Sequence, residues 1–493
     1  MITRSMFKAN DIRGIVAPDP ADGVTPTGSP EWDEDGARTI GATYVDIAGL
    51  AGKSFILGHD MRVSASRLVK AFAEGAAKRG ADVIYVGLVS TDELWYASGA
   101  MDLPGVQFTA SHNSPDYNGI KFCLPGAQPV TSDFLAQLAD DAIARDGKPI
   151  DNVTDLGVIS KTDVLEDYAS YLHSLVPLSA IRPLKVVVDA GNGMAGHTAK
   201  AVLDVDNIEL IGLYLDLDGT FPHHQPNPLI PENLVDAQRK VVEEKADIGL
   251  VFDGDADRCF IIDEQGNVVT PSVVTAVIAR AELAREPGAA IVVNSITGHV
   301  AHDVVSADGG KLVVSKVGHT YVKALMAEHN AIFGGEHSAH YYFREFWGAD
   351  TGMLAGLHVL AKLGRDSRPL SEIAAEYHTY VMSGEINHTV TDPSLVMNRI
   401  ADAFEGKGEI TWNDGLQVSS TGASPWWVSV RPSNTEPLLR LNVEAQQATI
   451  MEALRDDVSD LIVLYQDEVS GKTAIDAEAG IAQCGETTDR IAP

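Results

Sequence analysis

The stretch Ser54–Gly58, with the sequence SFILG, decides the fold class because it opens a strand–helix–strand pattern. Its apolar residues are typical of a buried strand. Residues Ser64–Arg79 follow with the periodicity of an amphipathic helix, and Ala81–Gly87 is a second run of strand length. Strands that alternate with helices imply a largely parallel sheet with helical crossovers, so we predict an α/β fold.

The same order of elements recurs twice further along the chain. The runs Val186–Ala190 and Ile291–Ser295 resemble Phe55–His59, since each is a short apolar strand that leads into a polar or glycine-containing loop and then a helix. This similarity predicts three related α/β domains. From about Gly384 the pattern changes to alternating apolar residues and two helices, which is typical of a smaller α+β domain.

We expect several domains in a chain of 493 residues, because single hydrophobic cores stop growing at about 250–300 residues. A hydrophobic content of 45% is ordinary for a folded protein and argues against disorder. Linker-like stretches lie near Gly147–Asp155, at Asp263–Asn267 and near Gly384. They divide the chain into four predicted domains, residues 1–153, 154–263, 264–383 and 384–493.

The composition narrows the class of partner. The formal charge of -32, from 69 acidic and 37 basic residues, disfavours binding to nucleic acid or to an anionic membrane surface. No run of about 18 apolar residues is present, and the N-terminal residues lack an apolar core of signal-peptide length. Three cysteines without metal-binding spacing suit a reducing compartment. We therefore expect a cytoplasmic protein, either a monomer or a small homo-oligomer.

A serine and a histidine lie at a sharp break between two extended runs. Within Val106–Phe122, the chain approaches as a strand, reaches Ser111 and His112, and turns at Pro115 and Gly119 before a second apolar pair. A hydroxyl on such a loop is open to substrate, and we interpret Ser111 as a phosphoryl carrier. The alternative is a serine that caps an ordinary turn.

Three carboxylates follow the apolar run Ile248–Phe252 at alternate positions. In extended backbone Asp253, Asp255 and Asp257 point to one side, where they can share a hard cation and leave a position open for a phosphate oxygen. Their spacing imitates an EF-hand, but Arg258 occupies the sixth position, where that loop needs glycine. The alternative to a metal site is a solvated acidic turn.

Two other loops carry polar groups in useful combinations. Residues Arg431–Pro437 offer a guanidinium, two hydroxyls, an amide and turn N–H groups, which suit a tetrahedral anion such as phosphate. Residues Gly334–His340 display a carboxylate, a hydroxyl and two imidazoles, which suit sugar hydroxyls. A solvated turn is the alternative in both cases. The dinucleotide-type match Gly191–Gly196 is predicted to be a structural turn, because Asp189 lies where phosphate oxygens would approach.

In order and spacing, four of these stretches resemble the α-D-phosphohexomutase family, and most closely its bacterial phosphomannomutase/phosphoglucomutase branch: Thr109–Lys121, Asp253–Arg258, Gly335–His340 and Arg431–Pro437. The resemblance spans nearly the whole chain. It implies three related α/β domains with mixed sheets and a smaller C-terminal α+β domain around a central cleft. It also implies reversible phosphoryl transfer between the 1- and 6-positions of a mannose or glucose phosphate, through a phosphoserine and a hexose 1,6-bisphosphate that also serves as activator.

The resemblance further implies roles for individual residues. The phosphate on Ser111 would bind Mg²⁺ together with Asp253, Asp255 and Asp257. The residues implied at the transfer step are His112, Lys121 and Arg258, with His112 or Lys121 moving the proton of the sugar hydroxyl. The residues implied in substrate binding are Arg13, His319, Glu336, Ser338, Arg431, Ser433, Asn434 and Thr435.

Departures and alternatives limit the assignment. The sugar loop leaves the preference between mannose and glucose open, while Ser433–Thr435 argues against the alternative of a phosphoglucosamine mutase. A serine hydrolase that uses Ser111 would lack the G-x-S-x-G elbow and would leave the acidic triplet unexplained. A non-catalytic sugar-phosphate-binding protein is the third alternative. Ala256 stands where the family commonly has glycine, which matters only if this residue needs a positive φ.

Overall fold

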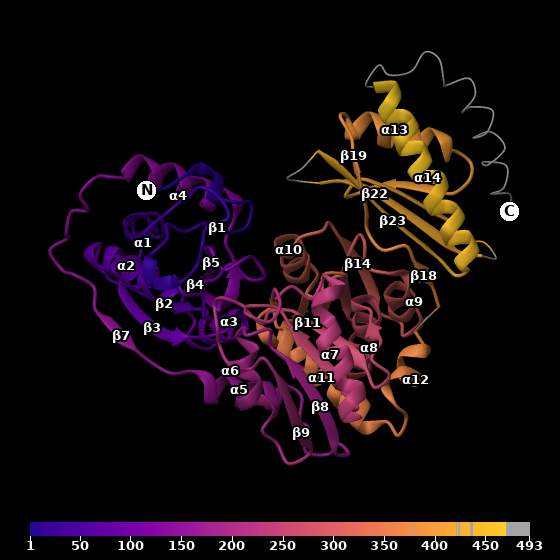
Figure 1. Ribbon diagram of the computed structural model, residues 1–493, viewed down its shortest axis with the longest axis horizontal. Coiled ribbons are helices and arrows are strands. Elements are labelled where there is room, and N and C mark those ends of the chain that lie inside the picture. Colours follow the sequence, from indigo (N-terminus) through magenta and orange to yellow (C-terminus); the bar gives the residue numbers. More distant parts are fainter. Residues whose placement is uncertain (378, 421, 423, 434–436, 470–493) are drawn as a thin grey trace.

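The computed structural model contains four β-sheets, each with its own helices, and describes residues 1–377, 379–420, 422, 424–433 and 437–469 (Figure 1). The first three sheets mix parallel and antiparallel strands, whereas every strand pair in the fourth sheet is antiparallel. This arrangement confirms the predicted fold class, three α/β domains and a smaller C-terminal α+β domain. We call them the first to fourth domains.

The first domain is built on the stretch that starts with SFILG, which forms the central strand β2. Its sheet has the order β1-β5-β4-β2-β3-β7, and β6 pairs with β5. Strands β4, β2, β3 and β7 are parallel, while β1, β5 and β6 run antiparallel to their neighbours. The strands are β1 Ile12–Ile15, β2 Ser54–His59, β3 Asp82–Leu88, β4 Gly105–Phe108, β5 Tyr117–Leu124, β6 Gln128–Pro129 and β7 Ile159–Lys161, and the α-helices are α1 Glu34–Ala48, α2 Ala65–Lys78, α3 Thr91–Met101 and α4 Ser132–Arg145.

The second domain places the predicted acidic loop at the end of a central strand. Its sheet has the order β12-β11-β10-β8-β9, in which β10, β8 and β9 are parallel and the hairpin β10–β11 is antiparallel. The apolar run Val186–Ala190 of the sequence corresponds to β8, which begins two residues earlier and ends at Asp189. The elements are α5 Leu165–Leu175, β8 Leu184–Asp189, α6 Ala195–Leu203, β9 Ile208–Leu213, α7 Val235–Glu244, β10 Ile248–Phe252, β11 Cys259–Asp263 and β12 Val268–Val269.

The third domain repeats this plan with the sheet order β14-β13-β15-β16-β17, in which β14, β13 and β15 are parallel. The antiparallel hairpin β15–β16 carries the predicted sugar loop at its turn. The elements are α8 Pro271–Arg285, β13 Ala290–Asn294, α9 His299–Ala307, β14 Lys311–Ser315, α10 His319–His329, β15 Phe333–Gly335, β16 Tyr341–Phe343, β17 Ala349–Asp350, α11 Gly352–Arg365 and α12 Leu370–Ala375.

The fourth domain has the sheet order β18-β23-β22-β21-β20, with β19 also paired to β23. Helices α13 and α14 pack against each other and against this sheet (Figure 1). The elements are β18 Val381–Met382, β19 Ile386–Thr389, α13 Pro393–Ala403, β20 Glu409–Trp412, β21 Leu416–Ser420, β22 Trp426–Pro432, β23 Leu438–Ala445 and α14 Ala448–Val469.

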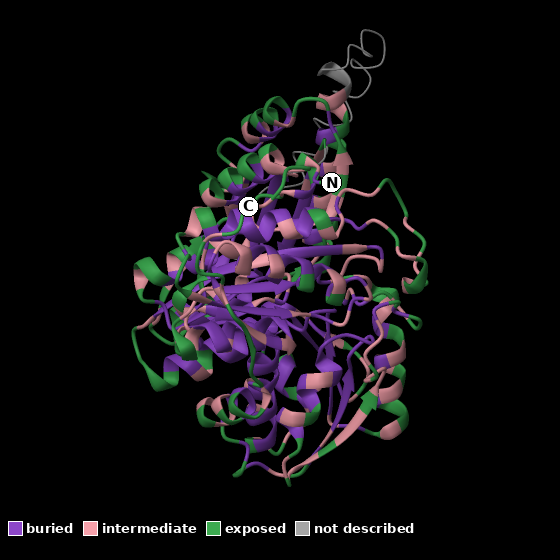
Figure 2. Cartoon of the chain, turned by 90° about the vertical axis from the view of Figure 1, so that its left-hand side faces the viewer, coloured by how far each residue is buried: buried purple, intermediate pink, exposed green. Residues whose placement is uncertain are grey.

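The hydrophobic cores show which domains are built as one body. One continuous cluster of buried side chains includes Leu94 and Trp95 of the first domain, Val187 of the second and Phe333 of the third. A second cluster fills the first domain beneath α1, α2 and α4. The fourth domain has a separate core. Buried residues concentrate along the strands, and exposed residues lie on the outer helices and loops (Figure 2). The first three domains therefore share a core that the fourth does not join.

Most differences from the predicted elements occur at their ends. The sequence predicts a helix near Ala37–Ala51, but helix α1 begins at Glu34, because the Asp33 carboxylate accepts a hydrogen bond from Gly36 N and caps the first turn. The sequence predicts a short strand at Ala331–Phe333, whereas strand β15 covers Phe333–Gly335. None of the described helices combines the length and the apolar character needed to cross a bilayer. The four predicted domain boundaries stay predictions.

Candidate active site

Ser111 lies in the loop that joins the antiparallel strands β4 and β5, as the sequence predicts. Its backbone adopts a left-handed conformation, with a φ of 48°, which a side chain disfavours by about 1–2 kcal/mol. The buried Ser111 Oγ donates a hydrogen bond of 2.7 Å to Asp253 Oδ2 and lies 3.2 Å from His112 Nδ1. The hydroxyl is thus held at the junction of the first and second domains.

The three carboxylates Asp253, Asp255 and Asp257 converge as predicted, although not by strand alternation. They follow β10 in a turn where Ala256 takes a φ of 63°, so the missing glycine costs backbone strain here. Their ligand oxygens all lie within 4.8 Å of one another, and all three side chains are buried. Such a group of oxygen ligands can bind a metal ion.

The acidic loop and the serine loop pack against each other without a gap. A side chain at Gly254 would bring its Cβ to 2.4 Å from Ser111 O, closer than any two such atoms approach. Glycine at this position therefore permits the approach that sets Ser111 beside Asp253. The predicted structural turn Gly191–Gly196 packs beneath the same loop, since Met194 N donates to Gly254 O at 2.9 Å.

Two cations compensate the carboxylates. Lys121 Nζ lies 2.7 Å from Asp255 Oδ2 and 2.6 Å from Asp257 Oδ2, while Arg258 Nε donates to Asp253 Oδ2 at 2.9 Å. Burial opposes ionisation of Asp255, but Lys121 outweighs it and lowers the pKa of this carboxyl far below its ordinary value. Burial likewise disfavours the charged Lys121, yet Asp255 and Asp257 raise the pKa of its ammonium above its ordinary value. Lys121 and Asp255 therefore remain ionised at neutral pH, whereas burial raises the pKa of Asp253 above its ordinary value despite the charge of Arg258.

His112 is held as a neutral acceptor. Arg258 Nη2 donates to its Nδ1 at 2.6 Å and lies 3.5 Å from Ser111 Oγ. Burial, followed by the charge of Arg258, lowers the pKa of His112 well below its ordinary value. The neutral imidazole thus lies beside the serine hydroxyl, with its Nδ1 lone pair accepting from Arg258.

These side chains line one pocket of about 150 Å³ between the first three domains. Arg13 enters it from β1 and donates to Asn113 Oδ1 at 2.9 Å, while His319 comes from the start of α10. Burial, with Lys323 next in importance, lowers the pKa of His319 to about 4. We call this cavity the Ser111 pocket; among its lining residues are Arg13, Ser111, His112, Lys121, Asp257, Arg258, His319 and His340.

The predicted sugar loop reaches this pocket only through His340, whereas Glu336 and Ser338 are not among the lining residues. The buried Glu336 carboxylate accepts hydrogen bonds from Asn294 Nδ2 at 3.1 Å and from the Tyr342 hydroxyl at 2.7 Å, which fix its orientation. Ser338 Oγ lies 2.9 Å from His340 Nδ1, and a β-bridge joins Arg258 to His340. The loop is thus attached to the acidic loop through its backbone.

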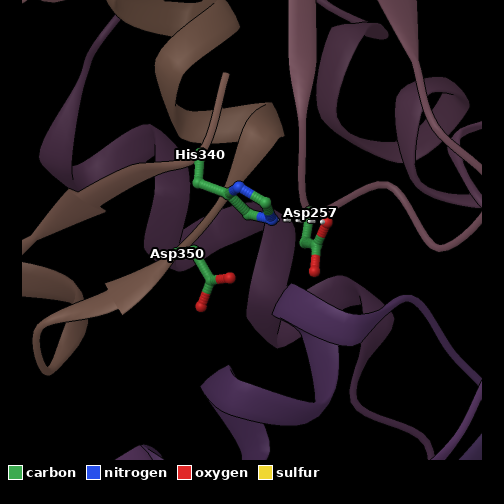
Figure 3. A group of neighbouring side chains, drawn as sticks. All are labelled: Asp257, His340 and Asp350. Carbon is green, nitrogen blue, oxygen red and sulfur yellow. Dashed lines mark ion pairs between the residues drawn. The ribbon is translucent and has the colours of Figure 1, made fainter. Parts of the chain in front are cut away.

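In the sequence, Asp350 and the histidines form no pair at a convincing helical ligand spacing, which argues against a transition-metal site, but the structure groups His340 with two carboxylates. His340 Nε2 points at Asp257, with 3.8 Å between Nε2 and Oδ1, and Asp350 lies beside both (Figure 3). The Asp350 carboxylate pairs with Lys323 Nζ at 2.7 Å, a buried ammonium that also faces the rings of Trp95 and Tyr342. Each of these residues has its partner on another helix, strand or loop. The group therefore cannot be recognised from the spacing of residues along the sequence.

The predicted phosphate-binding residues lie apart from the Ser111 pocket. Arg431 near the end of β22 stands opposite Arg440 of β23, and we call these two residues the arginine pair. Glu385 joins them, because Arg431 Nη2 donates to its Oε2 at 2.7 Å and Arg440 Nη1 lies 3.2 Å from its Oε1. Ser433 N donates to Leu438 O at 2.8 Å. The other two predicted residues, Asn434 and Thr435, lie outside the described residues.

Comparison with known proteins extends these observations to the whole chain. Models for the three alpha/beta/alpha domains and the C-terminal domain of phosphoglucomutase/phosphomannomutase match residues 4–147, 166–266, 270–380 and 385–461. The chain is 36% identical over 473 residues to a phosphomannomutase of Vibrio cholerae, which covers 93% of this chain and 98% of that protein. It is 36% identical over 465 residues to the phosphohexose mutases protein of Xanthomonas campestris, covering 94% of this chain and 100% of that protein.

A solved structure supports the same family assignment. The crystal structure of a phosphoglucomutase/phosphomannomutase family protein from Burkholderia thailandensis superposes with a TM-score of 0.82 at 32% sequence identity, and covers 94% of this chain and 98% of that one. Likeness of this extent in sequence and in fold, across all four domains, identifies the chain as a member of the phosphoglucomutase/phosphomannomutase family, a hexose phosphate mutase.

Proposed function

We propose that the protein interconverts the 1- and 6-phosphates of mannose, glucose or both, through a phosphoserine at Ser111 and a hexose 1,6-bisphosphate intermediate. The observation that carries this proposal is the position of Ser111 Oγ, 2.7 Å from Asp253 Oδ2 and 3.5 Å from Arg258 Nη2. A phosphoryl group on this oxygen would meet both a cluster of cation ligands and a guanidinium, which is what phosphoryl transfer requires.

The acidic triplet fits Mg²⁺. Two buried oxygens, Asp255 Oδ1 and Asp257 Oδ1, have no hydrogen-bond partner among the described residues, as expected of ligands that await a cation. Asp253, Asp255 and Asp257 would hold the ion, together with an oxygen of the Ser111 phosphate. Bound Mg²⁺ would neutralise negative charge on the phosphoryl oxygens.

The transfer step needs a base for the sugar hydroxyl. The hydroxyl oxygen attacks phosphorus, the bond between phosphorus and Ser111 Oγ breaks, and the hydroxyl proton leaves to a nearby acceptor. His112 is neutral and can take this proton once Arg258 turns from its Nδ1 to the phosphoryl group, whereas the Lys121 ammonium is already protonated and is engaged by two carboxylates. We assign the proton transfer to His112, and stabilisation of the Ser111 oxygen as it leaves to Arg258.

The sugar and its other phosphate are assigned to separate elements. Glu336 and Ser338 would contact sugar hydroxyls, and Arg13 and His319 would line the path between them and Ser111. Arg431, with Ser433, Asn434 and Thr435, would bind the phosphate that is not transferred. The bisphosphate then turns over and returns its other phosphate to Ser111, so added hexose 1,6-bisphosphate would activate unphosphorylated enzyme.

The experiment is a rate comparison with Mg²⁺ and a trace of glucose 1,6-bisphosphate on the 1-phosphates of mannose, glucose and glucosamine. We expect mannose and glucose phosphates to be converted to 6-phosphates at least about tenfold faster than glucosamine phosphate, since one altered polar contact is worth about 1.4 kcal/mol or more. Faster conversion of glucosamine phosphate would support the phosphoglucosamine mutase instead. Intact mass should show a gain of one phosphoryl group after incubation with the bisphosphate.

The hydrolase alternative receives less support from the geometry. His112 Nδ1 is hydrogen-bonded by Arg258, whereas the base of a hydrolytic triad is oriented by a carboxylate. A reactive-serine probe that labels Ser111 would revive it. A cytoplasmic location, and a monomeric or small homo-oligomeric state without nucleic-acid or membrane partners, stay predictions.

A further inference from the structure

One buried arginine outside the Ser111 pocket is bonded almost entirely to the backbone of the serine loop. Arg62 lies between β2 and α2, with its side chain fully buried. Its Nη2 donates to Ser111 O at 2.9 Å and to Asn113 O at 2.7 Å, and its Nη1 donates to Ser114 O at 2.7 Å and to Tyr117 O at 2.9 Å. One guanidinium therefore gathers four carbonyl groups of residues 111–117.

This bonding pattern sets the direction of the loop's peptide dipoles. The N–H and C=O of a trans peptide point in opposite directions, so the N–H groups of His112 and Ser114 point away from Arg62. Four converging carbonyl oxygens would repel one another without a cation between them. Arg62 thus stabilises a loop that turns its carbonyl groups to one side and leaves N–H groups on the other, an arrangement that suits a phosphate.

The second domain holds Arg62 from the opposite direction. The Phe221 ring stacks on its guanidinium, with 5.2 Å from Cζ to the ring centroid. A side chain at Gly219 would bring its Cβ to 2.7 Å from Arg62 Cα, so glycine is needed for this approach. Arg62 Nε lies 3.3 Å from Asp60 Oδ2, also buried. The guanidinium is fixed on three sides, and its position depends on both domains that form the junction.

We infer that Arg62 is a positioning residue for phosphoryl transfer, which holds Ser111 in its left-handed conformation so that the serine phosphate faces the acidic triplet. This inference rests on the proposed function, because it concerns the same transfer step. A planar guanidinium can reach four carbonyl groups at once, whereas a lysine ammonium has three donors in a tetrahedral arrangement. Arg62→Lys therefore keeps the positive charge but cannot make all four hydrogen bonds to the carbonyl groups of the serine loop.

The test is single-turnover transfer from enzyme phosphorylated with glucose 1,6-bisphosphate and freed of it, mixed with glucose 6-phosphate and Mg²⁺. The amplitude reports how much enzyme folds and carries phosphate, and the rate constant reports how well the phosphate is placed. We expect Arg62→Lys to lower the rate constant about 10²-fold, as small misplacements of reacting groups do, with KM within about threefold of wild type. Arg67→Lys, a matched change of a partly buried arginine in the same domain, should keep the wild-type rate constant.

The outcomes separate the two proposals. If Arg62→Lys transfers with the wild-type rate constant and only a reduced amplitude, Arg62 merely supports folding and the inference is overturned. If wild-type enzyme takes up phosphate but does not transfer it, the proposed function fails first. Should Arg62→Lys not fold, Phe221→Leu provides the second variant, because it loosens the guanidinium without removing a donor. We expect Phe221→Leu to lower the rate constant about threefold to tenfold, and an unchanged rate constant would also overturn the inference.

Discussion

The Ser111 pocket and the arginine pair both contain basic side chains that form ion pairs with carboxylates, but the two sets of ion pairs differ in burial and in the core that surrounds them. Lys121 and Arg258 are paired with a buried triplet that belongs to the core shared by the first three domains. The arginine pair shares a single carboxylate, Glu385, in a domain with a core of its own. The first region is preorganised for its proposed chemistry, whereas the second would have to exchange a protein carboxylate for the phosphate that we propose it binds.

The burial of the two regions indicates how costly such an exchange is. Removing one partner of a buried ion pair typically costs about 3–5 kcal/mol, while partly exposed pairs contribute about 0–1 kcal/mol. The side chains of Asp253 and Arg258 are 0% and 3% exposed, whereas Glu385 is 28% exposed and its partners Arg431 and Arg440 are 8% and 28% exposed. Release of Glu385 should therefore cost less than loss of Asp253, provided that a phosphate compensates the buried Arg431.

The largest effect is expected at the carrier itself. Ser111→Ala should lower kcat by at least about 10⁴-fold, because no other group can accept the phosphoryl group at this position. The measurement is the conversion of glucose 1-phosphate with Mg²⁺ and glucose 1,6-bisphosphate. Ser174→Ala, on the exposed part of α5, is the control and should retain wild-type activity. A fully active Ser111→Ala enzyme would remove Ser111 from the mechanism.

Removal of the divalent cation should have the next largest effect. Chelation with EDTA is expected to lower kcat by about 10³-fold, since a metal ion supplies several kcal/mol of charge stabilisation, and added Mg²⁺ should restore it. Asp255→Asn should raise the Mg²⁺ concentration needed for half-maximal activity, whereas Asp402→Asn on α13 should not. Activity that survives exhaustive chelation would mean that Lys121 and Arg258 suffice without a cation.

The sequence predicted the Ser111 pocket better than its surroundings, and the reason is physical. The strand before each loop is an apolar run, and the acidic triplet and the serine loop are each contiguous in the sequence. The spacing of residues along the chain was therefore enough to indicate both loops. The convergence of Asp253, Asp255 and Asp257 was predicted from strand alternation but arises in a turn, because Ala256 adopts a positive φ. The pattern of residues was sufficient, although the backbone geometry behind it was not foreseen.

Residues whose partners lie far along the chain could not be predicted in this way. Arg62 contacts backbone carbonyl groups about 50 residues away, and any residue can supply a carbonyl group, so the partner sequence holds no signal. Glu385 pairs with Arg431, and Lys323 pairs with Asp350. In both cases only folding brings the two elements together. A charged residue directly after a buried strand, as Arg62 is after β2, is the available hint that it serves the loop beside it.

The third prediction concerns the arginine pair as a phosphate site. Arg431→Ala should lower kcat/KM by about 10–10²-fold, mostly through KM, because a charge-assisted hydrogen bond to a phosphate contributes about 1.5–3 kcal/mol. Arg431→Lys should fall between this variant and wild type, since it keeps the charge without the planar fork. The control is Arg455→Ala on α14, a residue that pairs with its sequence neighbour Asp456. A KM unchanged in Arg431→Ala would place the second phosphate elsewhere.

The smallest effect distinguishes two roles for Glu385. If its carboxylate occupies the place of the phosphate, Glu385→Gln removes a competing anion and should tighten the binding of glucose 6-phosphate by about threefold to tenfold, which calorimetry measures directly. If Glu385 instead orients Arg431 for the phosphate, the same change should weaken binding. Glu409→Gln, exposed in the same domain, corrects for the lost charge at a distance.

Because Glu385 lies at the start of the fourth domain, its release by the phosphate would also free the segment that joins the core of the fourth domain to the core shared by the first three domains. Faster hydrogen exchange at β19 in Glu385→Gln than in Glu409→Gln, without substrate, would show that this ion pair also fastens the joining segment.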